Sequence, residues 1–223
     1  MRKILALVLV FIIPALILFT SFRINAFDYD FYEKQFEKHG IYGIAEKDFV
    51  DTNAKELISY FNNKAKVPEI FNEKEELHLN DVKNILQKTF LIHYVLITLF
   101  ILLVIYFIYK REFRLLSLSL IFGGISTLII LLLVSNLDFE STFTGFHEVA
   151  FNNTNWILNP ETDKLIVIFP LGFFQDMTYE IVRDSLYFAA GVIAVGLLGI
   201  LILRLKLNST KRVEGKMIKH NVH

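Results

Sequence analysis

Four long apolar runs constrain the fold of this chain more than any other feature. They cover residues 4–22, 90–109, 115–134 and 186–203. A helix needs about 20 residues to cross the hydrocarbon core of a bilayer, at a rise of about 1.5 Å per residue. The runs therefore predict an all-α membrane protein with four transmembrane helices. The 54% hydrophobic composition, with 22 Phe and 4 Pro, agrees with that class.

The first run has a second interpretation, because a secretory signal peptide also begins with basic residues followed by an apolar core. Here Arg2 and Lys3 precede the run, and Ala26 offers a poor cleavage site. The apolar stretch is longer than the roughly 7–15 residues of a signal core. We expect residues 4–22 to be retained as the first transmembrane helix.

The distribution of charge predicts the orientation in the membrane. Residues 1–3, 110–114 and 204–223 together hold 11 basic and two acidic side chains, so the remainder of this neutral chain carries a net charge of −9. By the positive-inside rule, both termini and the turn 110–114 are cytoplasmic. Residues 23–89 and 135–185 then form a mostly helical extracytoplasmic cap. The zero net charge argues against a nucleic-acid partner.

Several common catalytic arrangements are absent from the sequence. With no cysteine, disulfides, thiolate metal sites and cysteine nucleophiles are excluded. No G-x-S-x-G elbow, Walker A motif or G-x-G-x-x-G loop occurs, which disfavours serine acyl transfer and nucleotide chemistry. His147 and Glu148 begin an H-E-x-x-H pattern, but Phe151 occupies the second ligand position, which disfavours a zincin.

A polar stripe is predicted just before the second apolar run. Asn72 and Glu75 have the spacing of a helix N-terminal capping pair, so a helix should begin near Glu73 and continue toward the membrane. On that helix Glu75, His78 and Asp81 recur every three residues and share one side.

A second histidine follows the third apolar run, in an aromatic setting. Phe143, His147 and Phe151 recur every four residues and share a helix face, with Phe146 and Trp156 nearby. One interpretation is an aromatic belt at the membrane interface that happens to contain a histidine. The other is a catalytic base at the lipid surface, because imidazole titrates near neutral pH. These residues alone leave both open.

The remainder of the second outer segment leads into the fourth run. Asn159-Pro160 is a turn signal, and residues 164–169 (K-L-I-V-I-F) are expected to form a strand or an interfacial segment. A short helix that contains Asp176 should then connect to residues 186–203.

A metal site is a further possibility that the residues leave open. Glu75, His78, Asp81 and His147 could supply nitrogen and oxygen ligands, but they lack a tight local spacing. We therefore expect no metal and no cofactor. His93, inside the second run, is a functional candidate by its depth, although it lies close enough to the end to reach the interface.

Three ordered motifs together carry a family resemblance. The first, E-x-x-H-[LM]-x-D-V, is formed by Glu75, His78, Leu79, Asp81 and Val82. The second, F-H-x-x-x-F-x-x-x-x-W, is formed by Phe146, His147, Phe151 and Trp156. The third, F-P-x-x-F-F-x-D, is formed by Phe169, Pro170, Phe173, Phe174 and Asp176. With four spans and two outer segments, the chain resembles the bacterial lipoprotein intramolecular transacylase (Lit) family, although Leu79 stands where Met is frequent.

The resemblance implies an activity, a substrate and a location. The family moves the sn-2 acyl chain of a diacylated bacterial lipoprotein to the α-amino group of its N-terminal cysteine, which gives the lyso form. Its two important histidines correspond to His78 and His147 here. The other motif residues (Glu75, Asp81, Phe146, Phe151, Trp156 and Asp176) would support them. The enzyme would act at the outer face of the cytoplasmic membrane.

The chemistry of these residues suits such a reaction. An α-amino group has a pKa near ~7.7–8.0, and a histidine of pKa ~6.5 is well matched to accept its proton. Amine and ester belong to one substrate, so orientation supplies much of the rate. We hypothesise that His147 is the general base. His78, oriented by Glu75 or Asp81, would act on the oxyanion or the leaving alkoxide, and these roles could be exchanged.

Two alternatives come from other functional classes. A non-enzymatic membrane sensor would tolerate replacement of either histidine without a change in lipoprotein acylation. A metal-dependent membrane hydrolase would lose its activity on chelation. The sequence leaves open the preferred lipoproteins, the formation of an acyl-enzyme and the oligomeric state.

Overall fold

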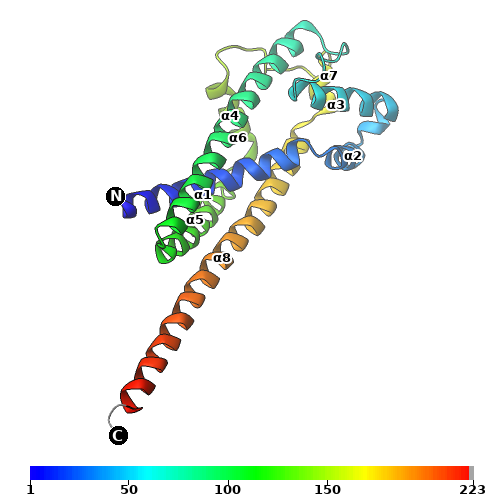
Figure 1. Ribbon diagram of the computed structural model, residues 1–223. Coiled ribbons are helices and arrows are strands. Elements are labelled where there is room, and N and C mark those ends of the chain that lie inside the picture. Colours follow the sequence, from blue (N-terminus) through cyan, green and yellow to red (C-terminus); the bar gives the residue numbers. More distant parts are fainter. Residues whose placement is uncertain (221–223) are drawn as a thin grey trace. The chain divides into compact units, whose positions relative to one another are not determined.

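The computed structural model describes the backbone of residues 1–220 and the side chains of residues 1–209, and this part of the chain is helical without strands. The elements, labelled in Figure 1, are α1 (Arg2–Ala26), α2 (Tyr29–Lys38), the 3-10 helix η1 (Ile41–Gly43), α3 (Lys47–Phe61), α4 (Glu73–Tyr109), α5 (Phe113–Val134), α6 (Phe139–Ala150), α7 (Lys164–Ile168) and α8 (Leu171–His220). The predicted all-α class is confirmed for the described residues. The last three residues of the predicted tail 204–223 lie outside them.

Four helices, α1, α4, α5 and α8, are long and apolar enough to cross a membrane, and they contain the four predicted runs. Figure 1 shows α4 as one unbroken helix. Its 37 residues correspond to about 55 Å, whereas the hydrocarbon core of a bilayer is about 30 Å thick. The residues of α4 before position 90 are therefore free to carry polar side chains outside the hydrocarbon.

The chain divides into two compact units. The first, here called the membrane unit, comprises Met1–Leu18, Val95–Leu132 and Ser185 onward. The second, here called the cap unit, comprises Phe19–Tyr94 and Leu133–Asp184.

The membrane unit is packed through aliphatic and small residues. Its buried cluster consists of Leu9, Ile12, Ile13, Ile17, Leu103, Phe107 and Ala189. A methyl group added to Gly196 of α8 would lie 2.7 Å from the carbonyl oxygen of Ser117 in α5, so only glycine permits this approach. The hydroxyl of Ser119 also donates to the carbonyl oxygen of Ala6 at 3.1 Å, which joins α5 to α1.

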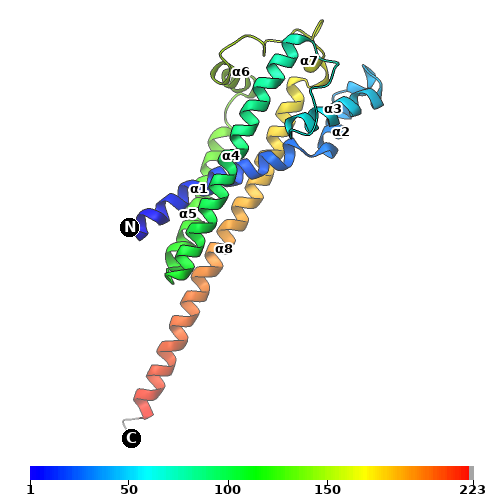
Figure 2. The ribbon, with the colours of Figure 1, turned by 45° about the horizontal axis from the view of Figure 1, so that its top comes forward.

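The cap unit has an aromatic core between α2, α3 and the first turns of α8. Phe36 of α2 and Phe173 of α8 are almost fully buried, and their rings stack with centroids 6.0 Å apart. Tyr32 lies beside both rings and donates its hydroxyl hydrogen to the carbonyl oxygen of Ala26 at 2.7 Å. Figure 2 shows α2 and α3 side by side. Large rings let these short helices bury enough apolar area to fold together.

Residues Lys164–Ile168 form the one-turn helix α7, so a strand, one of the two forms expected for residues 164–169, is wrong, while an interfacial segment stays a prediction. The apolar run buries Leu165 and Ile168 as an isolated turn. No neighbouring strand pairs with it within the described residues, and the backbone N–H of Leu165 donates instead to the Glu75 carboxylate at 2.6 Å. The Glu75 carboxylate thus accepts the backbone N–H that a neighbouring strand would accept in a sheet, which is what the β-favouring composition of this run suggested.

Candidate active site

The first turn of α4 fixes the position of His78. The backbone N–H of Asn72 donates to Glu75 Oε2 at 2.7 Å, and the N–H of Glu75 donates to Asn72 Oδ1 at 3.1 Å. This reciprocal pair is the predicted capping arrangement. It starts α4 at Glu73 and places His78 in the second turn, where 7% of the side chain is exposed.

Helix α6 holds His147 in one tautomer. Asp138 caps the helix by accepting the N–H of Ser141 at 2.9 Å. The Nδ1 atom of His147 lies 2.7 Å from the carbonyl oxygen of Phe143, one turn earlier. A carbonyl oxygen only accepts, so Nδ1 carries the hydrogen and donates it. In the neutral ring, Nε2 then has a free lone pair.

The two imidazoles meet although they are far apart in the sequence. Their ring centroids lie 5.9 Å apart and the planes are inclined by 35°. Phe151 contacts both, with its centroid 5.1 Å from His78 and 5.5 Å from His147. Trp156 and Phe146 lie 5.2 and 5.4 Å from His147. The second and first sequence motifs thus form one site, in which both histidines have aromatic walls.

Burial keeps both rings neutral near pH 7. Burial, together with the nearby His147, lowers the pKa of His78 to about 4, against the opposing effect of the Asp81 carboxylate. Burial also lowers the pKa of His147, against the opposing effect of its hydrogen bond to the Phe143 carbonyl. The buried Nδ1 of His78 has no hydrogen-bond partner among the described atoms. The site therefore offers one oriented proton acceptor and one neutral ring with an uncommitted nitrogen.

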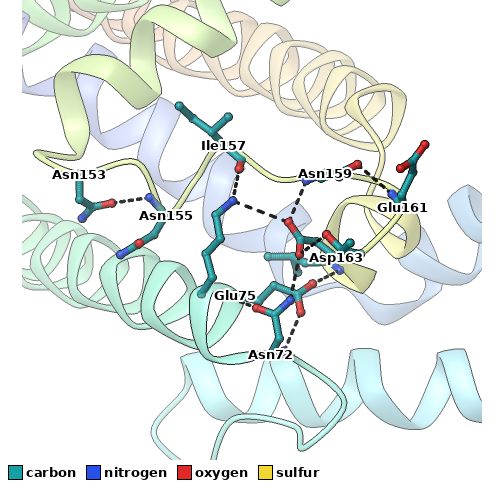
Figure 3. Close-up of polar contacts among 11 residues, drawn as sticks. Asn72, Glu75, Asn153, Asn155, Ile157, Asn159, Glu161 and Asp163 are labelled. Carbon is teal, nitrogen blue, oxygen red and sulfur yellow. Dashed lines mark hydrogen bonds and ion pairs between the residues drawn. The ribbon is translucent and has the colours of Figure 1, made fainter.

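A network of side chains on the start of α4 holds the segment that follows α6 (Figure 3). Asp163 Oδ1 accepts the side-chain amide of Asn72 at 2.9 Å, and Oδ2 accepts the N–H of Asn159 at 2.8 Å. Lys74 donates to the carbonyl oxygen of Ile157 and lies 3.8 Å from Asp163. These contacts, here called the α4 clamp, connect the segment that carries the site's tryptophan to the helix that carries His78.

Glu75 and Asp81 belong to this connection and do not touch His78 by hydrogen bonds. Both Glu75 oxygens accept backbone N–H groups, one of them from Leu165 in α7. Asp81 Oδ2 accepts the side-chain amide of Asn153 at 2.9 Å. No hydrogen bond among the described residues supports the prediction that Glu75 or Asp81 orients the His78 ring, and it stays a prediction; the Asp81 carboxylate acts on His78 through its charge. Both carboxylates hold the segment after α6 against α4.

Asp176 of the third motif lies in a different contact. It accepts Lys38 Nζ at 2.7 Å on both oxygens and lies 2.8 Å from His39 Nε2. Burial would raise the pKa of Asp176, but these two partners outweigh it and lower that pKa. Asp176 thus joins α8 to α2. Its neighbour Phe174 has a ring 5.3 Å from that of Phe143, which in turn lies 4.3 Å from the His147 ring.

Sequence reasoning missed Asp163, which is 5% exposed and whose carboxylate accepts hydrogen bonds from Asn72, Asn159 and Thr162. The turn between Asn159 and Asp163 could have been predicted from the sequence, because its composition is typical of turns. Its contact with Asn72 joins residues 91 positions apart, and no spacing in one sequence predicts such a pair.

The donor set does not favour a metal. Glu75 and Asp81 are committed to the contacts above and do not converge with the two imidazoles. Throughout the part of the chain that the structure describes, no three His, Asp or Glu side chains are arranged to hold an ion.

Comparison with protein families places this site in a known context. The family model described as lipoprotein intramolecular transacylase Lit matches residues 7–174. A relative from Aquifex aeolicus (strain VF5), whose own description is "Uncharacterized protein", is 30% identical over 213 residues. That alignment covers 89% of this chain and 96% of the relative.

Solved structures share the fold. The membrane integral lipoprotein intramolecular transacylase Lit from Bacillus cereus matches with a TM-score of 0.78 at 22% identity, over 92% of this chain and 98% of that one. A variant of the same protein with one histidine replaced by arginine matches with a TM-score of 0.80 at 23% identity, over 92% and 95%.

Proposed function

The chain belongs to the lipoprotein intramolecular transacylase (Lit) family and is a multi-pass membrane acyltransferase, and we propose that it acts on diacylated bacterial lipoproteins. In the proposed reaction, the acyl chain on the sn-2 oxygen of the diacylglyceryl group moves to the α-amino nitrogen of the N-terminal cysteine. The product is the lyso form, which is N-acylated and carries a monoacylglyceryl group.

One observation carries this proposal, namely the pair of buried, neutral imidazoles. His147 presents an unprotonated Nε2 because its Nδ1–H is held by the Phe143 carbonyl. His78 lies 5.9 Å away between centroids and has a pKa lowered to about 4. A group that remains neutral at pH 7 beside a proton acceptor is suited to donate a hydrogen bond rather than to exchange protons.

The roles of the two histidines follow from that difference. As the amine nitrogen attacks the ester carbon, His147 Nε2 accepts a proton from nitrogen. An N–H of neutral His78 donates a hydrogen bond to the oxyanion of the tetrahedral intermediate. The C–O bond to glycerol then breaks, and His147 returns its proton to the leaving alkoxide. The proton lost by nitrogen thus ends on the glycerol hydroxyl, and no group on the enzyme becomes acylated.

The aromatic residues would provide the surface for the acyl chains. Phe146 is 53% exposed although it packs against the His147 ring, and Phe151 and Trp156 close the other sides. Rings shield the ester from water, which strengthens the hydrogen bond to the oxyanion and limits hydrolysis. Because amine and ester belong to one molecule, the walls need only to hold them at reacting distance.

The charge distribution supports an extracytoplasmic site with both termini in the cytoplasm. The basic residues concentrate in residues 1–3, 110–114 and 204–223, as expected for cytoplasmic segments. Ser141 and Lys110 are both exposed, so each can be replaced singly by cysteine in this otherwise cysteine-free chain. A membrane-impermeant thiol reagent added to intact cells should label position 141 and not position 110, and the opposite pattern would reverse the orientation.

Mass spectrometry of a lipoprotein's N-terminal peptide tests the activity. Cells that lack other N-acylation and produce this chain should yield N-acyl, monoacylglyceryl cysteine, whereas cells producing His147→Ala should yield only diacylglyceryl cysteine. Unchanged diacylglyceryl cysteine with well-expressed wild-type protein would contradict the proposal and favour a non-enzymatic membrane sensor. Loss of the product on chelation would favour a metal-dependent enzyme.

A further inference from the structure

Arg23 lies where α1 leaves its apolar run, in a cradle that the transacylase chemistry does not use. Its guanidinium carbon is 5.0 Å from the ring centroid of Phe90 and 5.1 Å from that of Tyr94, and Nη1 donates to the Tyr94 hydroxyl at 2.6 Å. Both rings come from the first turns of the apolar part of α4. The arginine is partly buried, while Tyr94 is 51% exposed, so one side of the cradle is open.

This cation has no counter-charge among the side chains that the structure describes. The neighbouring polar groups are Thr20 and His93, whose Oγ1 and Nε2 lie 3.1 Å apart, and neither provides a negative charge. The nearest acidic contact of α1 is that of Asn25 with Asp184, at 2.9 Å. Asn25 is two residues from Arg23, about 200° around the helix, so this carboxylate lies on another side.

A partly desolvated guanidinium without an anion is costly, and the cradle leaves most of its five N–H donors unused. The apolar run 4–22 ends just before Arg23, and the run 90–109 begins at Phe90. Arg23 therefore lies at the edge of the hydrocarbon, where phospholipid phosphates lie. Phosphate oxygens match the planar fork of arginine in charge and geometry. We propose that Arg23, held by Phe90 and Tyr94, binds the phosphate group of a membrane phospholipid.

This site is separate from the catalytic pair. Phe90 follows His78 by 12 residues on α4, which corresponds to about 18 Å along the helix. The lipoprotein substrate proposed above carries a diacylglyceryl group without a phosphate, so the ligand of Arg23 is a different lipid. Its role would be to hold the junction of α1 and α4 at a fixed depth in the membrane.

Native mass spectrometry of the detergent-solubilised full chain with phosphatidylglycerol tests this proposal. We expect Arg23→Gln to lower lipid occupancy by about tenfold, and Arg23→Lys by only a few-fold because lysine keeps the charge but loses the fork. The matched control is Arg183→Gln, since Arg183 already pairs with Glu180 and Asp184 and should show wild-type occupancy. Thermal unfolding without lipid checks that each variant is folded; if Arg23→Gln is not, the lysine variant decides.

Diacylglycerol and inorganic phosphate complete the design. Diacylglycerol should show no adduct that depends on Arg23, and millimolar inorganic phosphate should displace little phosphatidylglycerol. Equal lipid occupancy in wild type and the Arg23 variants would overturn the site. Displacement by inorganic phosphate at lipid-like concentrations would overturn the lipid assignment in favour of a free anion. Acyl transfer, measured on the same samples, should be retained in Arg23→Gln, so a failure here is distinct from a failure of the transacylase proposal.

Discussion

The membrane unit and the cap unit differ in what they bury. Among the described residues, the buried polar groups of the membrane unit are hydroxyls, those of Ser117, Ser119, Thr127 and Ser185. The cap unit buries ionisable groups as well, namely Glu75, His78, His93, His147 and Asp163. The hydroxyls of Ser119 and Thr127 donate to carbonyl oxygens one turn earlier in their helix, which costs little, whereas a buried ionisable group must be paired or kept neutral. The difference separates a unit built for packing from a unit built for chemistry.

Replacement of His147 should break the cap unit's function most severely. We expect His147→Ala to lower acyl transfer by about 10³-fold or more, because general acid–base catalysis contributes about 10²–10⁴-fold and this ring serves both steps. The rate would be followed with a purified diacylated lipopeptide. His39→Gln, in the contact with Asp176, is the control and should change the rate less than about threefold. Comparable rates in the two variants would remove His147 from the mechanism.

His78 should have a smaller effect and a different signature. His78→Ala should lower kcat by about 10²–10³-fold with little change in KM, which is the usual result of removing an oxyanion donor. His78→Gln restores an N–H donor of similar reach and should recover part of the loss. If glutamine is no better than alanine, donation to the oxyanion is not the role of this residue.

The α4 clamp should matter for both stability and rate. Asp163→Asn and Glu75→Gln each replace a buried charged acceptor of backbone N–H groups, at a cost of about 1–3 kcal/mol in unfolding free energy. We expect kcat to fall by about tenfold because the segment with Trp156 is held less firmly against the site. The pH dependence of the remaining activity should keep its wild-type shape, since His147 is unchanged. A shifted profile would mean that these carboxylates act on the histidines electrostatically.

The pH dependence sharpens the assignment of the base. Because the pKa of His147 is lowered below 6.5, its ring is already mostly neutral at pH 6.5. The rate of acyl transfer should therefore rise with pH through the pKa of the substrate amine, about 7.7–8.0, and level off roughly one pH unit above it, where most of the amine is neutral. An N-terminal amine of lower pKa in the lipopeptide should move this rise to lower pH. If the pH of the rise stays the same when the pKa of the substrate amine is changed, the titrating group belongs to the enzyme.

The same shifts affect stability in a defined direction. The folded pKa of His78, about 4, lies below its unfolded value of about 6.5, so the unfolded chain binds the proton more readily. The stability of the cap is then complete above pH 6.5 and declines as the pH falls toward 4. His78→Gln should weaken this decline in thermal unfolding experiments.

Substitutions of two glycines in the membrane unit should have the smallest effects, and these should be limited to stability. A methyl group on Gly196 would meet the Ser117 carbonyl oxygen at 2.7 Å, whereas one on Gly191 would meet nothing within 4 Å. Gly196→Ala should cost about 1–3 kcal/mol of stability, and Gly191→Ala should gain up to about 1 kcal/mol from helix propensity. Both should leave kcat per folded molecule unchanged. A loss of kcat in Gly196→Ala would show that packing in this unit controls the site.

The parts that could be predicted from sequence are those with local causes. Apolar length identified the four long helices, and the Asn72–Glu75 spacing predicted the start of α4. The two histidine motifs indicated a site, although their meeting required the fold. Two expectations missed the same long-range contact, that between Glu75 and Leu165: Glu75 or Asp81 was expected to orient His78, and the run with Leu165 was expected to be a strand or an interfacial segment. In the structure these two groups bind each other across 90 residues.

A labelled-chain crossover experiment tests the intramolecular, histidine-based transfer most directly. Two diacylated lipopeptides of different peptide mass would be mixed with purified enzyme, one of them carrying an isotopic label only in its sn-2 chain. The mechanism predicts N-acylated products in which the label stays on the peptide that brought it, moves from glycerol to nitrogen, and does so only when His147 is present. The mechanism would be contradicted if label appeared on the nitrogen of the other peptide, or if the peptide of the labelled substrate were N-acylated by an unlabelled chain.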